Sequence, residues 1–245
     1  MLLPDAKAAS FKNLKDYWKT LAKHSTGEAV ETTELVQVTT GIFSPLFNPF
    51  FLKESAKALP LTHFTFAHSF WYDAERNKAV ALDAKHIEPV MEHVPMMMVD
   101  LDKEMAVNLP TGFVMERVQN NHDLSAWIQP VAVAFSMTPE MALAYQRCLE
   151  SASDEFIHFV VKKEGVVVAG ASLYLHPETA GFYNLGVLPE FRKQGIGTAL
   201  HHVRMNAARE KGYANATLQA TPMAAHLGAS LGFETCSEVT IYKRR

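Results

Sequence analysis

The stretch LGVLPEFRKQGIGTALHHV, residues 185–203, constrains this chain more than any other, because a strand pattern changes to a helix pattern at a pair of glycines within it. Residues 181–187 have the apolar character of a strand. From Gly195 to Lys211, apolar residues recur on one helix face, and Gly212 follows as a helix stop. Such a turn exposes backbone N–H groups beside the positive end of a helix dipole. The stretch therefore predicts an anion-binding turn.

The residues of this turn suit a pyrophosphate. Gly195 and Gly197 would let it approach the backbone without meeting a Cβ atom, and Arg192 and Lys193 add positive charge. The alternative is a plain strand-to-helix connection that needs glycines only for its turn. A Walker A loop is excluded, because no lysine follows Gly197, and a dinucleotide fingerprint is disfavoured, because its third glycine position holds Leu200.

What remains is the pattern R-x-x-G-x-G, preceded by NLGVLPEF and followed by LGF at residues 231–233. With these motifs the sequence resembles the GNAT superfamily of N-acetyltransferases from Phe113 to the C-terminus, most strongly over residues 181–233. The resemblance implies that acetyl-CoA binds as co-substrate. It places the pyrophosphate contacts on Lys193, Gln194, Gly195, Ile196, Gly197 and Thr198, with Arg192 either touching the ligand or supporting the turn.

The resemblance also gives a role to the strand before the turn. In the family this strand carries a bulge and splays from its neighbour, and its free backbone groups pair with the pantetheine arm and polarise the thioester carbonyl. These groups map onto Leu185, Gly186 and Val187. A glycine inside a strand pattern independently favours a bulge or a close backbone approach.

The catalytic side chains stay unassigned at this stage. Where many family members place a glutamate base, this chain has Asn184 and Gln219, which do not titrate. Gly228 stands at the position of the usual tyrosine acid, and His226 is expected to be an ordinary surface histidine facing away from it. The resemblance predicts acetyl transfer to an amine of a small molecule, peptide or protein. The alternative is a non-catalytic protein that senses or sequesters acyl-CoA.

The chain length fits one large domain or two ordinary ones, since typical domains hold roughly 100 to 200 residues. The segment VNLPTGF, residues 107–113, is the best linker. We therefore predict a smaller α/β domain over residues 1–110 and a GNAT domain over residues 111–245, an α/β fold with a mixed, splayed sheet flanked by helices. The apolar layout of FSPLFNPFF and FTFAHSFWY resembles a degenerate GNAT-like half.

Three local patterns in the first part are specific enough to check. Apolar spacing predicts an amphipathic helix over residues 10–24, a helix interrupted at Pro89 over residues 83–94, and a strand over residues 96–101. In the second part, MAAHLGASLG predicts a short helix before a last strand.

Composition narrows the partners. A formal net charge of −3 suggests no nucleic-acid partner, and no apolar run reaches the ~18 residues of a membrane span. No H-E-x-x-H or C-x-x-C motif indicates a metal. The only cysteines, Cys148 and Cys236, favour a reducing compartment, by default the cytoplasm. Nothing in the sequence indicates the acceptor or the oligomeric state.

Overall fold

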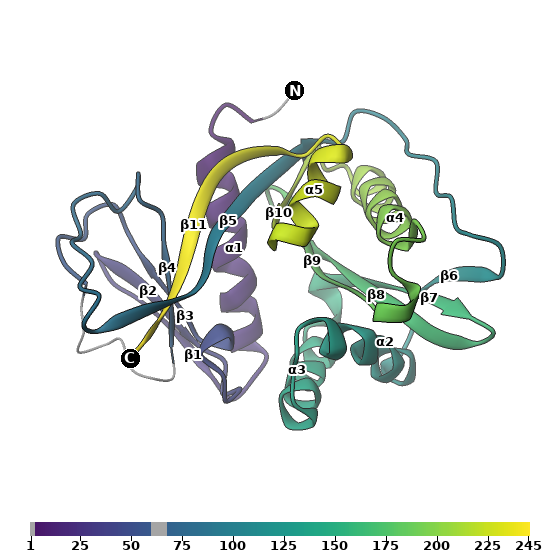
Figure 1. Cartoon of the computed structure of the whole chain (residues 1–245), viewed down its shortest axis with the longest axis horizontal. Coiled ribbons are helices and arrows are strands. Elements are labelled where there is room, and N and C mark those ends of the chain that lie inside the picture. The colour runs from purple at the N-terminus through teal and green to yellow at the C-terminus, as the bar shows by residue number, and fades with distance from the viewer. Residues whose placement is uncertain (1–2, 60–67) are drawn as a thin grey trace.

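The computed structural model describes residues 3–59 and 68–245 (Figure 1). The first part of the chain forms α1 (Ala6–Lys23), β1 (Glu28–Glu31), β2 (Leu35–Thr39), η1 (Pro45–Phe47), β3 (Pro49–Leu52), β4 (Ser69–Tyr72) and β5 (Ile87–Asp100). The second part forms β6 (Phe113–Arg117), α2 (Asn121–Ala134), α3 (Pro139–Ser151), η2 (Ser153–Glu155), β7 (Phe156–Lys163), β8 (Val166–Leu175), β9 (Ala180–Val187), η3 (Pro189–Phe191), α4 (Ile196–Glu210), β10 (Asn215–Gln219), α5 (Pro222–Ser230) and β11 (Glu234–Arg244).

The described strands form one mixed sheet in the order β1-β2-β3-β4-β11-β5-β10-β9-β8-β7-β6. β3 pairs in parallel with β4 and β9 with β10, while the other neighbours are antiparallel. β5 comes from the first part of the chain but lies between β10 and β11, and β11 in turn pairs with β4. The two parts therefore exchange strands, and the predicted boundary near residue 110 lies in the connection from β5 to β6.

The predicted helix over residues 83–94 is wrong. Most of that segment is the first half of β5, which continues through the predicted strand of residues 96–101 as a single 14-residue strand. β5 pairs with β11 on one side and, from Met96 onward, with β10 on the other. Its partners come from the far end of the sequence, and such pairing overrides local apolar spacing.

Helices cover both faces of the sheet. Since successive side chains along a strand point to opposite faces, a single strand packs against helices on both sides. In β7, Phe156 and Val160 pack with α2 and α3, whereas Ile157, Phe159 and Val161 pack on the opposite face in the core that includes α4. α1 confirms the predicted amphipathic helix and lies on the α2–α3 face, where it contacts both β2 and β9 (Figure 1). The predicted mixed α/β sheet flanked by helices is confirmed.

The resemblance of the first part to a degenerate GNAT-like half involves FTFAHSFWY, whose residues 64–67 lie outside the described residues. The rest of that motif includes β4. Within residues 3–59 and 68–245, no helix combines the length and apolar character needed to cross a membrane.

The strand exchange predicts that residues 111–245 do not fold alone. Without β5, strand β10 loses its antiparallel partner, and β11 loses a neighbour that it follows from Glu234 to Arg244. We expect the 111–245 fragment to show no cooperative urea unfolding by circular dichroism, and the full chain to unfold cooperatively. Adding the separate 1–110 fragment should restore the transition, and a cooperative transition of the 111–245 fragment alone would refute the prediction.

Candidate active site

The glycine turn lies between β9 and α4, as the sequence predicts. The chain leaves β9 through η3 and reaches α4 by way of Lys193 with a φ of 58° and Gly195 with a φ of 84°. Left-handed residues at such spacing turn successive backbone N–H groups toward one side, which favours an anion. A Cβ atom at Gly195 would meet nothing within 4 Å, so this position is open to a ligand.

The start of α4 differs from that of the other described α-helices. Side chains of Asp5, Asn120, Thr138 and Thr221 accept a backbone hydrogen bond at the starts of α1, α2, α3 and α5. α4 begins after Gly195 without any side-chain cap. Its first N–H groups therefore have no partner within the helix and are available to phosphate oxygens.

Side chains of two other motif residues, Arg192 and Gln194, make hydrogen bonds that hold the turn in place. Arg192 Nε donates to the carbonyl oxygen of Val187 at 3.0 Å, and Gln194 Nε2 donates to that of Glu190 at 3.3 Å. Arg192 thus connects the turn to the end of β9, which suits the supporting role. A Cβ atom at Gly197 would lie 3.1 Å from a methyl carbon of Leu227, so this glycine also lets α5 pack closely.

β9 carries the expected bulge and separates from β10. Its register with β8 shifts between Tyr183 and Gly186, and Asn184 within the shift has a φ of 58°. The pairing of β9 with β10 covers Ala180 and Gly181 alone. Beyond Gly181 the two strands splay, which leaves the segment Leu185, Gly186 and Val187 without strand β10 beside it.

Gly186 is needed for the close approach of a helix rather than for the bulge itself. A Cβ atom there would come within 2.7 Å of the Pro130 carbonyl oxygen, and one at the paired Gly170 within 2.9 Å of Trp127. α2 therefore packs with its backbone almost against the strands. The left-handed residue of the bulge is Asn184, which tolerates this conformation better than most non-glycine residues.

A group of tyrosines, of which Tyr17 and Tyr145 are buried, lies over the bulge, and no sequence motif indicated it. The rings of Tyr17 in α1 and Tyr183 in β9 stack with centroids 3.8 Å apart. The hydroxyls of Tyr17 and Tyr145 are 2.6 Å apart, and Asn184 Nδ2 donates to Tyr145 Oη at 2.7 Å. The Tyr183 hydroxyl donates to Asn13 Oδ1 at 2.7 Å. α1 and α3 thus close one side of the splay.

The ionisable groups near the bulge are held neutral by burial. Burial raises the pKa of Tyr17 to about 12 and those of Tyr145 and Tyr183 well above 10. Burial also lowers the pKa of His158 to about 3, and His158 Nδ1 lies 2.8 Å from the Ser172 hydroxyl. These side chains can give or accept hydrogen bonds near neutral pH but do not change charge.

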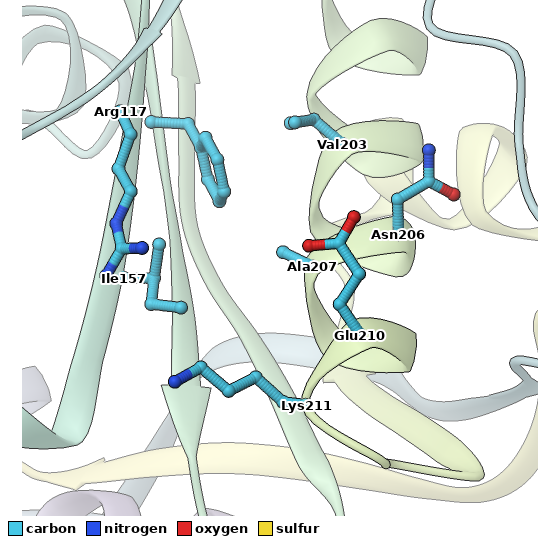
Figure 2. Close-up of a pocket in the computed structure, with 8 residues that line it drawn as sticks. Arg117, Ile157, Val203, Asn206, Ala207, Glu210 and Lys211 are labelled. Carbon is cyan, nitrogen blue, oxygen red and sulfur yellow. The ribbon is translucent and has the colours of Figure 1, made fainter.

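A cavity lies away from the glycine turn. A space of about 500 Å³ opens between the edge strands and the C-terminal half of α4, where Arg117 and Ile157 face Val203 and Ala207 (Figure 2). None of the motif residues lines it. Among the described residues, no group of three or more His, Cys, Asp or Glu side chains is placed to hold a metal.

The family model described as "Acetyltransferase (GNAT) family" matches residues 121–233, which include the bulge, the glycine turn, α4 and α5. The chain contains a GNAT acetyltransferase domain. A domain of this family implies acyl transfer from an acyl-CoA. No curated protein matches the chain.

Solved structures extend the likeness of fold beyond this domain. A "GCN5-related N-acetyltransferase from Kribbella flavida" is 15% identical with a TM-score of 0.67, covering 95% of this chain and 94% of its own. A "GCN5-related N-acetyltransferase-like protein" from Streptococcus suis is 14% identical with a TM-score of 0.60, and the match covers 97% of this chain and 99% of the Streptococcus suis chain. A "tandem GNAT protein from the clavulanic acid biosynthesis pathway" is 14% identical with a TM-score of 0.57, and the match covers 85% of this chain and 77% of the tandem protein. These GNAT folds therefore include the first part of the chain.

The open position at Gly195 predicts a charge-specific effect on ligand binding. Gly195→Asp would cap α4 and place a carboxylate among the N–H groups, whereas Gly195→Asn has the same shape without the charge. Both side chains tolerate a left-handed backbone. We expect calorimetry to show that Gly195→Asp weakens acetyl-CoA binding by about 10-fold or more relative to Gly195→Asn, with similar melting temperatures. Equal affinities would show that the turn does not hold the pyrophosphate.

Proposed function

We propose that the protein transfers an acetyl group from acetyl-CoA to an amine of a small molecule, peptide or protein. The observation that carries the proposal is the hydrogen bond from Arg192 Nε to the Val187 carbonyl, which joins the anion-binding turn to the splayed strand. The bond sets a definite spacing between a site for phosphate and a site for a thioester. Binding acetyl-CoA at both its pyrophosphate and its thioester would position the thioester carbon for attack by the amine.

Two features of the described residues fit acetyl-CoA. The open Cβ position of Gly195 gives a pyrophosphate access to the start of α4. Gln219 Nε2, at the end of β10 where β9 and β10 have separated, is buried beside the Tyr183 hydroxyl but makes no hydrogen bond of good geometry to it or to another described group. A buried amide donor in such a gap is costly unless a ligand acceptor pairs with it, and the carbonyls of a pantetheine arm are such acceptors.

In the proposed reaction the neutral amine nitrogen forms a bond to the thioester carbon, and the carbon–sulfur bond breaks. The amine proton passes to solvent, and the departing CoA thiolate takes up a proton from solvent, which leaves an amide and CoA. Negative charge develops on the thioester oxygen during the attack. Those backbone N–H groups of the segment Leu185, Gly186 and Val187 that point into the splay, rather than toward β8, would stabilise that charge.

The structure explains the glycine at the usual tyrosine position. A Cβ atom at Gly228 would lie 3.2 Å from the Met97 sulfur and 3.7 Å from the Phe233 Cβ. The Met97 side chain of β5 therefore packs tightly where a side chain at residue 228 would begin. His226 is exposed, as expected for an ordinary surface histidine. We infer that the thiolate leaves without a protein acid, because a thiol with a pKa of about 8.5 is a tolerable leaving group near neutral pH.

The glycine at residue 228 also favours the second candidate, a non-catalytic acyl-CoA-binding protein. Such a protein would use the same turn and strand without turnover. For either candidate, the free thiols of Cys148 and Cys236 support a reducing compartment such as the cytoplasm.

The two candidates predict different results with acetyl-CoA and a panel of amines. An acetyltransferase releases CoA thiol over time with at least one amine and yields one acetylated product per thiol. We expect calorimetry to show one acetyl-CoA site per chain and a thiol assay to show amine-dependent release. Tight binding with no release above the amine-free control for any amine would favour the sensor and contradict the acetyltransferase.

An unaided departure of the thiolate predicts a simple dependence on pH. The rate should rise as the acceptor amine loses its proton, since amines titrate near pH 10 and react only when neutral. The buried tyrosines have pKa values raised to about 12 or well above 10, so they stay protonated. We expect kcat to show no falling limb below about pH 9 when chemistry limits turnover. A falling limb in that range that disappears in Tyr145→Phe or Tyr183→Phe would identify a protein acid and overturn this inference.

A further inference from the structure

Arg204, in the middle of α4, is a buried arginine whose guanidinium lies against the bulge of β9. Its side chain is 1% exposed. Nη1 donates to the carbonyl oxygens of Ser172 at 3.2 Å and Tyr183 at 3.4 Å, and Nε donates to that of Leu200 at 3.0 Å. The helix that begins at the glycine turn therefore also contacts the bulge, from the face opposite α1 and α3.

The charge of Arg204 is matched by dipoles rather than by an acid. Its remaining neighbours are His201 Nδ1, 3.3 Å from Nη2, and the Phe182 ring, with the centroid 4.5 Å from Cζ. Burial alone lowers the pKa of Arg204, to about 9, which leaves it positive near neutral pH. Burial and the nearby Arg204 charge hold the pKa of His201 well below its usual range, so His201 is neutral.

Stability alone does not explain a cation at this place. Removing a guanidinium from water is expensive, and apolar residues that fill the same volume are often as stable as a buried ion pair. Within the part of the chain that the structure describes, Arg204 lacks even the carboxylate of such a pair, because its hydrogen bonds go to carbonyl oxygens and a neutral histidine. Cations and perturbed groups of this kind are concentrated at functional sites.

The bonded carbonyl of Tyr183 belongs to the peptide that leads into Asn184. The backbone of Asn184 is left-handed, and its side chain donates to Tyr145 Oη and, at 3.3 Å, to Ser172 Oγ. Arg204 holds the peptide from the α4 face, and Tyr145 holds the Asn184 side chain from the α3 face. The next residues of the chain are the segment Leu185, Gly186 and Val187, so the direction of its N–H groups depends on this peptide.

We propose that Arg204 is a positioning residue for acyl transfer: its guanidinium fixes the Tyr183–Asn184 peptide, which aims the N–H groups of the following segment at the thioester oxygen. Its positive charge, in an interior with little water, also favours the negative charge that develops on that oxygen. This inference rests on the proposed use of acetyl-CoA. It concerns polarisation of the bound thioester, and it therefore needs no knowledge of the acceptor.

The test is the infrared spectrum of isotope-labelled acetyl-CoA bound to the full chain. Hydrogen bonds to a carbonyl lower its stretching frequency, so the labelled thioester should absorb at a lower frequency when bound than in water. Arg204→Met keeps an unbranched side chain that packs in an apolar interior, although a shorter one, and removes the charge and the donors. We expect this variant to lose about half or more of the shift, with kcat about 10-fold to 100-fold lower and acetyl-CoA affinity within about threefold. A full shift in Arg204→Met would overturn the proposal.

Two further variants separate positioning from folding. Met205→Ala removes a buried neighbour in α4 that makes no bond to the bulge, and should lower the melting temperature while keeping the full shift. Arg204→Lys keeps the charge but cannot reproduce the planar fork, and should keep part of the shift. If Arg204→Met does not fold, a full shift in Arg204→Lys overturns the proposal. Absence of acetyl-CoA binding by the unaltered chain would instead refute the proposed function.

Discussion

The bulge at Asn184 is the local constraint on which the site depends. It shifts the register of β9 with β8, which resumes at Gly186, and it lies shortly after the last residues of β9 that pair with β10. Because the extra residue changes the alternation, Tyr183 and Asn184 both reach toward α1 and α3, while Leu185 lies near Gly197 at the start of α4. The irregular peptide thus lies where the gap between the strands begins, and the glycine turn lies beside that gap.

The first part of the chain completes this site in two ways. α1 contributes Tyr17 and Asn13, which bind the residues of the bulge, and β5 occupies the place in the sheet between β10 and β11. Met97 of β5 also fills the space in front of Gly228. The first part of the chain therefore contributes both to the sheet of the second part and to the packing around Gly228.

The features that could be predicted from the sequence were those with a pattern of residues close together in the chain. The glycine turn was predictable, because Gly195 and Gly197 stand between clear strand and helix patterns, and Gly186 correctly indicated a close backbone approach. The first half of β5 was mistaken for a helix, whereas its second half was correctly predicted as a strand; both partners of β5 follow more than a hundred residues later. Tyr17, Tyr145 and Arg204 carry no motif and meet only through tertiary packing, so no local pattern could identify them.

Hydrogen–deuterium exchange of the full chain with and without acetyl-CoA tests most directly whether the turn and the splayed strand bind one ligand. The account predicts that amides of residues 185–187 and 193–198 gain protection together, since both segments would pair with the same molecule. Protection confined to the cavity between β7 and α4 (Figure 2), or protection of one segment without the other, would contradict it.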